Sequence, residues 1–225
     1  MCGGRGTRLR GEAGGRKRGP TTPDGERGPT TPDVEKPLVE IGGEPMFDRV
    51  VDALRGSRIG EDRTASAGTI HAVVSPNAPE TAERARELSL SVVDTSGGGY
   101  VSDLTAALDA IGRPALTVPA DLPLLAPEHV DDAIERSFTD GGGRTNTRTN
   151  RPEPTSLTVC TPVALKRRLG ASVDTSFEHD GRAVAPTGLN VVAGDDDTVA
   201  LTYDARLAVN VNRPGDRELA EALCG

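Results

Sequence analysis

The sequence predicts a single α/β domain built as a three-layer sandwich around a mainly parallel sheet. Two observations lead to this prediction. Apolar segments of strand length alternate with segments in which apolar residues recur at helical spacing, and this alternation is typical of right-handed βαβ units. A chain of 225 residues also buries roughly 70% of its unfolded surface, so a hydrophobic core can form without disulfides or structural metals.

The elements are expected from Lys36 onward, with strands and helices in alternation. Strands are predicted at 38–41, 69–74, 90–93, 114–118, 157–160, 189–192 and 207–211. Helices are predicted from Pro45, at 78–88, after Gly99, at 127–138 and from about Pro214. In the helix after Gly99, the spacing predicts that one face turns inward and carries Val101, Leu104, Leu108 and Ile111.

Two segments lack apolar periodicity and are expected to be disordered insertions, one near residues 11–34 and one at 139–155. The first contains a nearly perfect tandem repeat of nine residues, in which 18–26 reads RGPTTPDGE and 27–35 reads RGPTTPDVE. A duplicated sequence so rich in Pro, Gly and Thr offers few side chains to a core. We therefore expect this insertion to lie on the surface and to be dispensable for chemistry.

The composition restricts the class of protein. A formal net charge of −8 argues against a general nucleic-acid binder, because a phosphate backbone requires a basic face. No apolar run approaches the ~20 residues of a membrane span, and three scattered cysteines indicate reduced thiols in a cytoplasm. Few aromatic residues, few lysines and acidic clusters such as 195–197 fit a halophilic archaeon, although GC-biased codon usage would also favour Arg over Lys.

The first candidate for chemistry is the glycine-rich stretch Cys2-Gly3-Gly4-Arg5-Gly6-Thr7-Arg8-Leu9. Closely spaced glycines let backbone N–H groups turn toward an anion, and the two arginines can add charge-assisted hydrogen bonds to phosphate. The stretch lacks the Gly-Lys-Ser/Thr ending of a Walker A motif. Taken alone, it is either a phosphate-binding loop or a disordered terminus.

Two further candidates stand at the boundaries of predicted strands. Lys36 is one of only three lysines, with Lys17 and Lys166, in a chain whose other basic residues are arginines. Asp121 follows the buried strand at 114–118, at the carboxyl end where open α/β sheets bind ligands. Its carboxylate is a natural ligand for Mg²⁺ that bridges a nucleoside triphosphate. The alternatives are a solvated lysine beside a proline turn and an aspartate that caps the following turn.

The sequence shows no arrangement of a Ser or Cys nucleophile with a histidine base. The three histidines, His71, His129 and His179, are isolated from one another. His71 lies in an apolar predicted strand, and we expect it to be a hydrogen-bonded core residue rather than a catalyst.

The loop, the lysine and the aspartate together resemble the nucleotidyltransferase superfamily that includes sugar-phosphate and molybdopterin guanylyl- and cytidylyltransferases. Its members carry a Gly-Gly-x-Gly-Thr-Arg loop after the first strand, then Lys-Pro-Leu, and later a strand that ends in Asp-x-Pro. The resemblance implies a Rossmann-like sheet of the nucleotidyltransferase type. It also implies that Lys36 neutralises the triphosphate, that Asp121 holds Mg²⁺, and that the triphosphate is wrapped by Gly3, Gly4, Arg5, Gly6, Thr7 and Arg8.

Narrower motifs resemble one branch, the archaeal adenosylcobinamide-phosphate guanylyltransferases. They are the segments 74–81 (VSPNAPET), 94–104 (DTSGGGYVSDL), 186–192 (PTGLNVV) and 210–213 (NVNR). The resemblance implies that Asn77 and Asp94 hold guanine, that Gly188 and Asn190 line the acceptor side, and that Asn212 approaches the metal and phosphates. As alternatives, Asp94 caps the glycine-rich turn and Asn190 stabilises a local turn.

The implied function is transfer of GMP from GTP to adenosylcobinamide phosphate in cobalamin biosynthesis. Arg8, Lys36, Asp121 and Asn212 are the implied catalytic residues, and Mg²⁺ is the implied cofactor. A guanylyltransferase for another acceptor such as molybdopterin, and a nucleotide-binding module without activity, remain alternatives. The expected enzyme is cytoplasmic and binds neither nucleic acid nor membrane, while the existence of a homodimer is left open.

The sequence departs from the superfamily at its start. Members have a strand of about six residues ahead of the glycine loop, whereas Met1-Cys2 adjoins the loop here. We therefore expect that the first strand is missing from the sequence as written, through a start assigned to an internal methionine.

Overall fold

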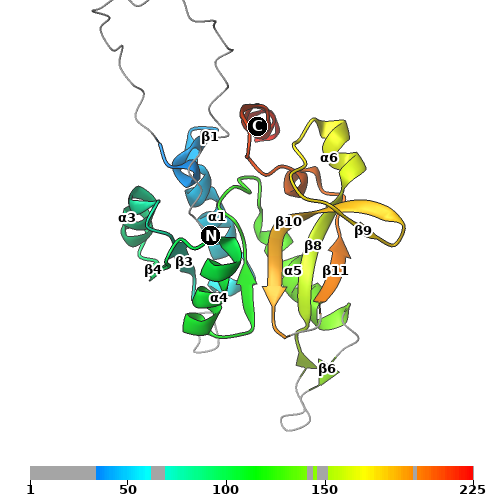
Figure 1. The fold of residues 1–225 in the computed structure, drawn as a ribbon, viewed down its shortest axis with the longest axis horizontal. Coiled ribbons are helices and arrows are strands. Elements are labelled where there is room, and N and C mark those ends of the chain that lie inside the picture. Colours follow the sequence, from blue (N-terminus) through cyan, green and yellow to red (C-terminus); the bar gives the residue numbers. More distant parts are fainter. Residues whose placement is uncertain (1–33, 62–68, 141–143, 146–151, 195–196, 225) are drawn as a thin grey trace, which may run out of the picture.

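The structure, a computed structural model, describes residues 34–61, 69–140, 144–145, 152–194 and 197–224 (Figure 1). The described part is a mixed α/β fold with one five-stranded sheet and three two-stranded sheets. The expected insertion at 11–34 lies outside the described residues except for Val34, and the one at 139–155 lies partly outside them. Among the helices of the described ranges, none is long and apolar enough to cross a membrane.

The five-stranded sheet contains β5 (Ala115–Thr117), β8 (Ser156–Pro162), β9 (Phe177–His179), β10 (Arg182–Val192) and β11 (Asp197–Leu201). Its order is β11-β8-β10-β5, and β9 also pairs with β10. β11 is parallel to β8, but β10 is antiparallel to β8, β9 and β5. This sheet is therefore mixed rather than mainly parallel, because a tight turn at Asp180 and Gly181, both with positive φ, folds β10 back along β9.

A parallel βαβ unit forms the other half of the fold. β3 (His71–Val74) and β4 (Ser91–Asp94) are joined by α3 (Pro79–Glu87), which begins at a proline because the first helical turn does not use that N–H group. The two strands are in register from His71 opposite Ser91 to Val74 opposite Asp94. This unit confirms the two strands and the helix that the sequence predicts between 69 and 93.

The remaining helices cover these strands. They are α1 (Met46–Arg55), α2 (Arg58–Glu61), α4 (Tyr100–Ile111), α5 (Pro127–Thr139), α6 (Val163–Leu169) and α7 (Pro214–Leu223). α5 packs against β8 and β10, whereas α4 contacts β3 (Figure 1). The helices predicted from Pro45, after Gly99, at 127–138 and from Pro214 are confirmed to within one or two residues.

Two predicted strands are largely replaced by helical turns. At 38–41 the chain forms η2 (Lys36–Leu38) and then the short strand β1 (Glu40–Ile41), which pairs with β2 (Glu44–Pro45). At 207–211 it forms η3 (Ala205–Ala208), because the Asp204 carboxylate caps this turn by accepting the Arg206 N–H. Another short pair, β6 (Arg144–Thr145) with β7 (Pro152–Glu153), lies within the segment predicted to be unstructured.

The buried face of α4 also differs from the prediction. Val101 is 75% exposed and Ile111 is 37% exposed, whereas Asp103, Ala107 and Leu108 are buried. The Asp103 carboxylate accepts a hydrogen bond from the N–H of Gly97, so the start of the helix is fixed with Asp103 turned inward. The inward face of this helix therefore carries Leu108, as predicted, together with the polar residue Asp103.

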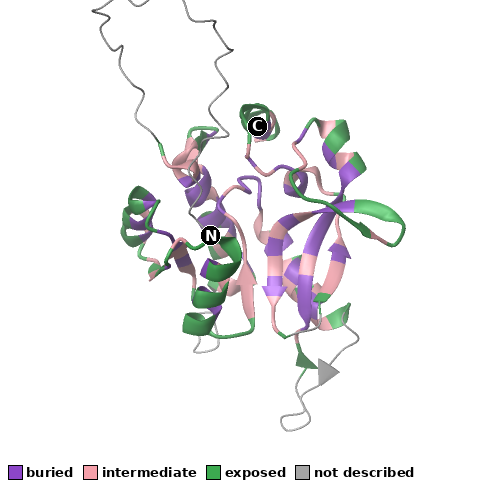
Figure 2. Ribbon diagram, viewed as in Figure 1, coloured by how far each residue is buried: buried purple, intermediate pink, exposed green. Residues whose placement is uncertain are grey.

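Buried apolar side chains form three clusters, and the buried residues of the ribbon are purple in Figure 2. The largest joins α1 and α5 to the five-stranded sheet and includes Val50 and Leu157. A second joins α1 to β3 and α3 through residues such as Phe47 and Val74. Because α1 contributes to both clusters, it ties the βαβ unit to the five-stranded sheet.

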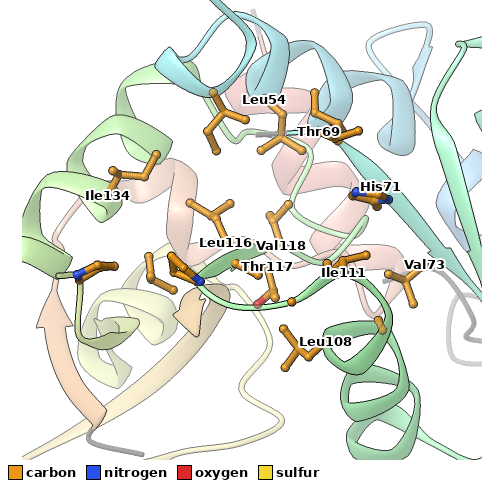
Figure 3. Close-up of a pocket in the computed structure, with 18 of the residues that line it drawn as sticks. Leu54, Thr69, His71, Val73, Leu108, Ile111, Leu116, Thr117, Val118 and Ile134 are labelled. Atoms are coloured by element: carbon orange, nitrogen blue, oxygen red, sulfur yellow. The ribbon is translucent and has the colours of Figure 1, made fainter. Parts of the chain in front are cut away.

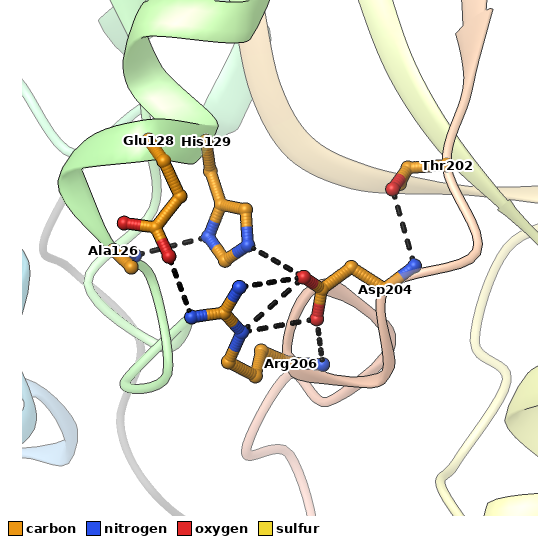
Figure 4. A network of polar contacts seen from close by, with 6 residues as sticks. All are labelled: Ala126, Glu128, His129, Thr202, Asp204 and Arg206. Atoms are coloured by element: carbon orange, nitrogen blue, oxygen red, sulfur yellow. Dashed lines mark hydrogen bonds and ion pairs between the residues drawn. The ribbon is translucent and has the colours of Figure 1, made fainter.

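A polar network fixes the start of α5 to the segment around η3 (Figure 4). His129 Nδ1 accepts the Ala126 N–H at 3.0 Å, so its Nε2 carries the proton and donates to Asp204 Oδ2 at 2.9 Å. Arg206 donates to both Asp204 and Glu128. The pKa of Asp204 is held well below its usual value, first by the hydrogen bonds from Arg206 and then by His129.

We expect this network to make stability depend on pH on the acid side. A carboxyl group whose pKa is lower in the folded than in the unfolded state stabilises the fold above its unfolded pKa of about 3.9 and loses that contribution as the pH falls. Asp204→Asn should therefore lower the Tm at pH 7, and its difference from the wild type should shrink below about pH 4. Calorimetry from pH 3 to pH 7, with the exposed Asp180→Asn as control, measures this; a difference that stays constant with pH would contradict it.

Candidate active site

The carboxyl ends of β3 and β5 lie at the same edge of the molecule, because the adjacent residues Glu35 and Lys36 reach both. The Glu35 carboxylate accepts the N–H groups of Glu80 and Thr81 at the start of α3, which follows β3. The Lys36 ammonium contacts Asp121, which follows β5. A crevice outside the carboxyl ends of strands is where open α/β sheets bind their ligands.

Three predicted catalytic residues converge at this edge. Lys36 Nζ donates to Asp121 Oδ2 at 2.5 Å and to Asn212 Oδ1 at 2.7 Å, although the partners are 85 and 176 residues away in sequence. The side chains of Lys36 and Asp121 remain 17% and 20% exposed, so a ligand can reach them. The rest of the predicted phosphate-binding set lies outside the described residues: Gly3, Gly4, Arg5, Gly6, Thr7 and Arg8.

The backbone around these side chains is fixed by both local and long-range hydrogen bonds. The carbonyl oxygen of Asp121 accepts the Val211 N–H at 2.8 Å. Asp216, which is 1% exposed, accepts the N–H of Asn212 at 3.1 Å and that of Ser172 at 2.7 Å. The segment that carries Asn212 is therefore anchored both to the end of β5 and to the first turn of α7.

Two residues that the sequence analysis did not select stand behind Asp121. Asn210 Nδ2 donates to Asp121 Oδ1 at 3.2 Å and to the Thr187 carbonyl at 2.9 Å. Lys166 Nζ donates to the Ala208 carbonyl at 2.7 Å and to Asn210 Oδ1 at 3.4 Å. Because an ammonium group only donates, Lys166 keeps the Asn210 oxygen toward itself and leaves the Asn210 amide N–H groups to hold the carboxylate.

Lys166 is a buried cation, 4% exposed. Burial lowers its pKa, while the negative charges of Asp216, Asp121 and Asp174 act in the opposite direction. The rarity of lysine is one signal for this residue in the sequence. Of the three lysines in the chain, Lys36 and Lys166 lie at this site. Lys166 lies on α6, a helix that the sequence did not predict. Its contact with Asn210, and through Asn210 with Asp121, could therefore not be expected.

The predicted guanine-binding residues lie at the neighbouring strand ends. Asp94 is the last residue of β4 and is exposed, opposite Val74 of β3. Asn77 lies in the turn after β3, and a Cβ atom at Gly97, which has φ of +71°, would stand 3.6 Å from its amide nitrogen. The turns after β3 and β4 thus touch each other, with a glycine at the point of contact.

Tyr100 is a further polar group close to Asp121. The pKa of its phenol is raised, first by partial burial and second by the negative charge of Asp121. Tyr100 is the first residue of α4 and directly follows the glycine-rich turn. Tyr100 therefore follows the glycine-rich turn after Asp94 in the chain and also lies near Asp121.

The predicted acceptor-side residues lie on β10 at an irregularity in its pairing with β8. Gly188 has φ of +89°, and a Cβ atom there would be only 2.6 Å from Pro119, two residues before Asp121. Asn190 Nδ2 donates to the Gly188 carbonyl at 3.0 Å, which is the local turn contact of the alternative interpretation. Gly188 is thus brought beside the site, and Asn190 supports the backbone around it.

Comparisons with known proteins show what this chain is similar to. Residues 1–185 match the family described as the MobA-like NTP transferase domain. An adenosylcobinamide-phosphate guanylyltransferase from Methanocaldococcus jannaschii is 27% identical in an alignment of 198 residues that covers 84% of this chain and 89% of that protein. A solved structure titled as a hypothetical transferase from Thermus thermophilus is similar to 71% of this chain with a TM-score of 0.42 and 18% identity, and the chain spans 56% of its length. The chain belongs to the MobA-like NTP transferase domain family and is a nucleotidyltransferase.

Proposed function

We propose that this protein transfers GMP from GTP to adenosylcobinamide phosphate, which yields adenosylcobinamide-GDP and pyrophosphate during cobalamin biosynthesis. The convergence of Lys36, Asp121 and Asn212 at the carboxyl ends of the strands is the observation that carries a nucleotidyl transfer here. The choice of acceptor is supported by the similarity to the guanylyltransferase of Methanocaldococcus jannaschii. We further propose that the protein acts in the cytoplasm.

The residues at the site fit a Mg²⁺ ion. Asp121 Oδ2 and Asn212 Oδ1 already point at one positive charge, the Lys36 ammonium. Within the described ranges, no cluster of three or more His, Cys, Asp and Glu side chains could hold a metal alone. Mg²⁺ commonly binds through one or two carboxylates with water and substrate phosphates, so Asp121 would hold it, and the ion would neutralise the phosphates and orient them.

The chemistry requires alignment more than proton transfer. An oxygen of the acceptor phosphate forms a bond to the α-phosphorus of GTP while the bond from that phosphorus to pyrophosphate breaks. The attacking phosphate is already an anion, so no strong general base is needed. Lys36, together with Arg5 and Arg8, would neutralise the triphosphate, and Asn212 would position it.

The two substrates would contact different segments of the chain. Asn77 and Asp94 would hold guanine, because a carboxylate can accept the N1–H and N2–H₂ groups of that base. Gly188 and Asn190 would line the acceptor side, where the glycine lets β10 approach Pro119.

Incubation with GTP and adenosylcobinamide phosphate tests the proposal directly. We expect pyrophosphate release that depends on both substrates, and mass spectrometry should detect adenosylcobinamide-GDP. Activity with molybdopterin instead would point to a different acceptor. GTP binding without turnover of either acceptor would support a nucleotide-binding module and refute the proposal.

We expect Asn210→Ala to reduce the rate without removing substrate binding. The change takes away the donor that holds Asp121 Oδ1, and loss of such a supporting contact typically costs about 10–100-fold in activity or metal affinity. The kcat should fall in that range, the Mg²⁺ concentration for half-maximal rate should rise, and the KM for GTP should change less than threefold. A lowered Tm with unchanged kcat and Mg²⁺ dependence would mean that Asn210 has only a structural role.

A further inference from the structure

An apolar groove lies between β3 and β5, where the two halves of the fold meet (Figure 3). It has a volume of about 540 Å³ and is lined by both strands and by α1, α4 and α5. His71 of β3 lines it, and the Nδ1 atom of His71 is buried without a hydrogen-bond partner among the described residues, contrary to the expectation of a hydrogen-bonded core residue. Because β3 and β5 do not pair with each other in the described sheets, other contacts join the two halves at the site.

Glu35 supplies such a contact on the side of β3, where its side chain caps α3. The helix begins at Pro79, and its N-cap residue, Ala78, makes no side-chain cap hydrogen bond. The Glu35 carboxylate accepts the N–H of Glu80 at 2.8 Å and that of Thr81 at 2.8 Å, although these residues lie 45 and 46 positions away in sequence. A carboxylate at this place satisfies N–H groups that the helix itself leaves unpaired, and it opposes the positive end of the helix dipole.

The cap also holds the turn that carries Asn77. Thr81 is 0% exposed, and its hydroxyl donates to Glu35 Oε2 at 2.6 Å, so the first turn of α3 is bound to Glu35 through side chain and backbone. Asn77 directly precedes the N-cap residue of this helix, and the Ala78 N–H donates to the Ser75 carbonyl at 3.0 Å, which closes the turn. The position of Asn77 therefore depends on where Glu35 holds α3.

The backbone leaves little freedom between the side chains of Glu35 and Lys36. Lys36 is the first residue of η2, in which the Leu38 N–H donates to the Glu35 carbonyl at 2.9 Å. Pro37 is buried in the middle of this turn, and its ring fixes φ there. Lys36 Nζ in turn donates to Asp121 after β5. Two consecutive residues thus connect the turn after β3 to the residues after β5.

We propose that Glu35 is a positioning residue that couples base recognition to phosphate neutralisation, because it fixes the turn of Asn77 relative to the ammonium group of Lys36. The roles of these two ends rest on the proposed guanylyl transfer. A nucleotide whose base is held at Asn77 and Asp94 brings its phosphates to Lys36 in one position, whereas a poorly held base leaves them misplaced. Since a misplacement of about 1 Å can cost about 10²-fold in rate, the coupling favours the correct base in the rate as well as in binding.

Glu35→Gln tests the coupling, with Arg84→Gln as the matched control. The amide keeps the size of the side chain but accepts through only one oxygen, so part of the cap is lost. Arg84 anchors the same helix to Asp48 of α1, so Arg84→Gln loosens α3 while the contacts of Glu35 and Lys36 remain. We expect both variants to lower the Tm. Only Glu35→Gln should lower kcat by about tenfold or more and reduce the preference for GTP over ATP in kcat/KM at least tenfold.

Equal losses of kcat and of base preference in the two variants would overturn the coupling, because loosening of α3 alone would then explain them. Normal kcat and preference in Glu35→Gln would leave Glu35 only a structural cap, and a lower kcat with unchanged preference would confine its effect to Lys36; both results would also overturn it.

Amide hydrogen exchange tests the coupling without any substrate. In Glu35→Gln the exchange of the Leu38 and Thr81 amides should rise together by about tenfold, whereas in Arg84→Gln the exchange of Leu38 should stay unchanged. Unchanged exchange of Leu38 in Glu35→Gln would refute the coupling. If the unchanged protein shows no turnover with either acceptor, the proposed function fails, and the exchange result alone decides whether Glu35 couples the two segments.

Discussion

Asp121→Ala is expected to reduce kcat by about 10²–10³-fold, which is the size of effect seen when one charge-stabilising group is removed from an active site. The carboxylate accepts from Lys36 and Asn210 on its two oxygens. Without it, the two donors would no longer be held in place and Mg²⁺ would lose its proposed protein ligand. The backbone contact from Val211 to the Asp121 carbonyl does not depend on the side chain, so the fold should persist.

The matched measurements separate chemistry from folding. Asp121→Asn keeps the shape of the side chain and removes only its charge, and we expect a loss of activity close to that of the alanine variant. Asp109→Ala, which changes an exposed aspartate on α4, should stay within twofold of the wild type. The Tm of each variant, measured in parallel, should change by only a few degrees. Near-normal kcat in Asp121→Ala would exclude this residue from the site.

GTP is expected to be preferred over ATP, CTP and UTP by on the order of 10⁴-fold in kcat/KM, because a site that pairs the polar edge of one base leaves its own groups unpaired with another. Asp94 is exposed at the end of β4 and Asn77 lies in the adjoining turn after β3. The carboxylate would repel the N1 acceptor of adenine and accept from the N1–H of guanine.

Asp94→Asn should erode this preference, since the amide can donate to adenine as well as accept from guanine. We expect the kcat/KM for GTP to fall and that for ATP to rise, so that the ratio drops by at least tenfold. Competition assays with all four nucleotides measure the ratio, and Asp109→Asn serves as the control for charge. Comparable use of ATP and GTP by the unchanged protein would exclude Asn77 and Asp94 as the base-reading pair.

The local parts of the fold could be predicted because each depends on neighbouring residues. Pro79, Pro127 and Pro214 mark the starts of three helices, and the apolar segment at 69–74 contains β3. The direction of β10 could not be predicted in the same way, because it depends on a turn at Asp180-Gly181 that reverses the chain. The exposed position of Val101 and the inward position of Asp103, which accepts the Gly97 N–H, are not encoded in apolar periodicity.

The same difference between local signals and contacts of distant residues applies to the candidate site. Lys36 and Asp121 could be selected from the sequence because each borders a predicted element, and the structure joins them. Asn210 and Lys166 could not, since their roles arise from contacts between α6, the 208–210 segment and the end of β5. The rarity of lysine indicated Lys166, and the 210–213 motif contains Asn210, but neither signal reveals the contact with Asp121.

Glu35 contacts the start of α3 and Lys36 contacts Asp121. These two contacts affect how the length of the preceding segment can vary over evolution. Glu35 is the last residue of the second nonapeptide copy, and the two copies differ only at Gly25 and Val34. A further copy added ahead of Glu35 and Lys36 would leave both contacts in place. Gain or loss of whole repeats by replication slippage should therefore leave the geometry around Lys36 unchanged, which makes this segment a natural place for length polymorphism between strains.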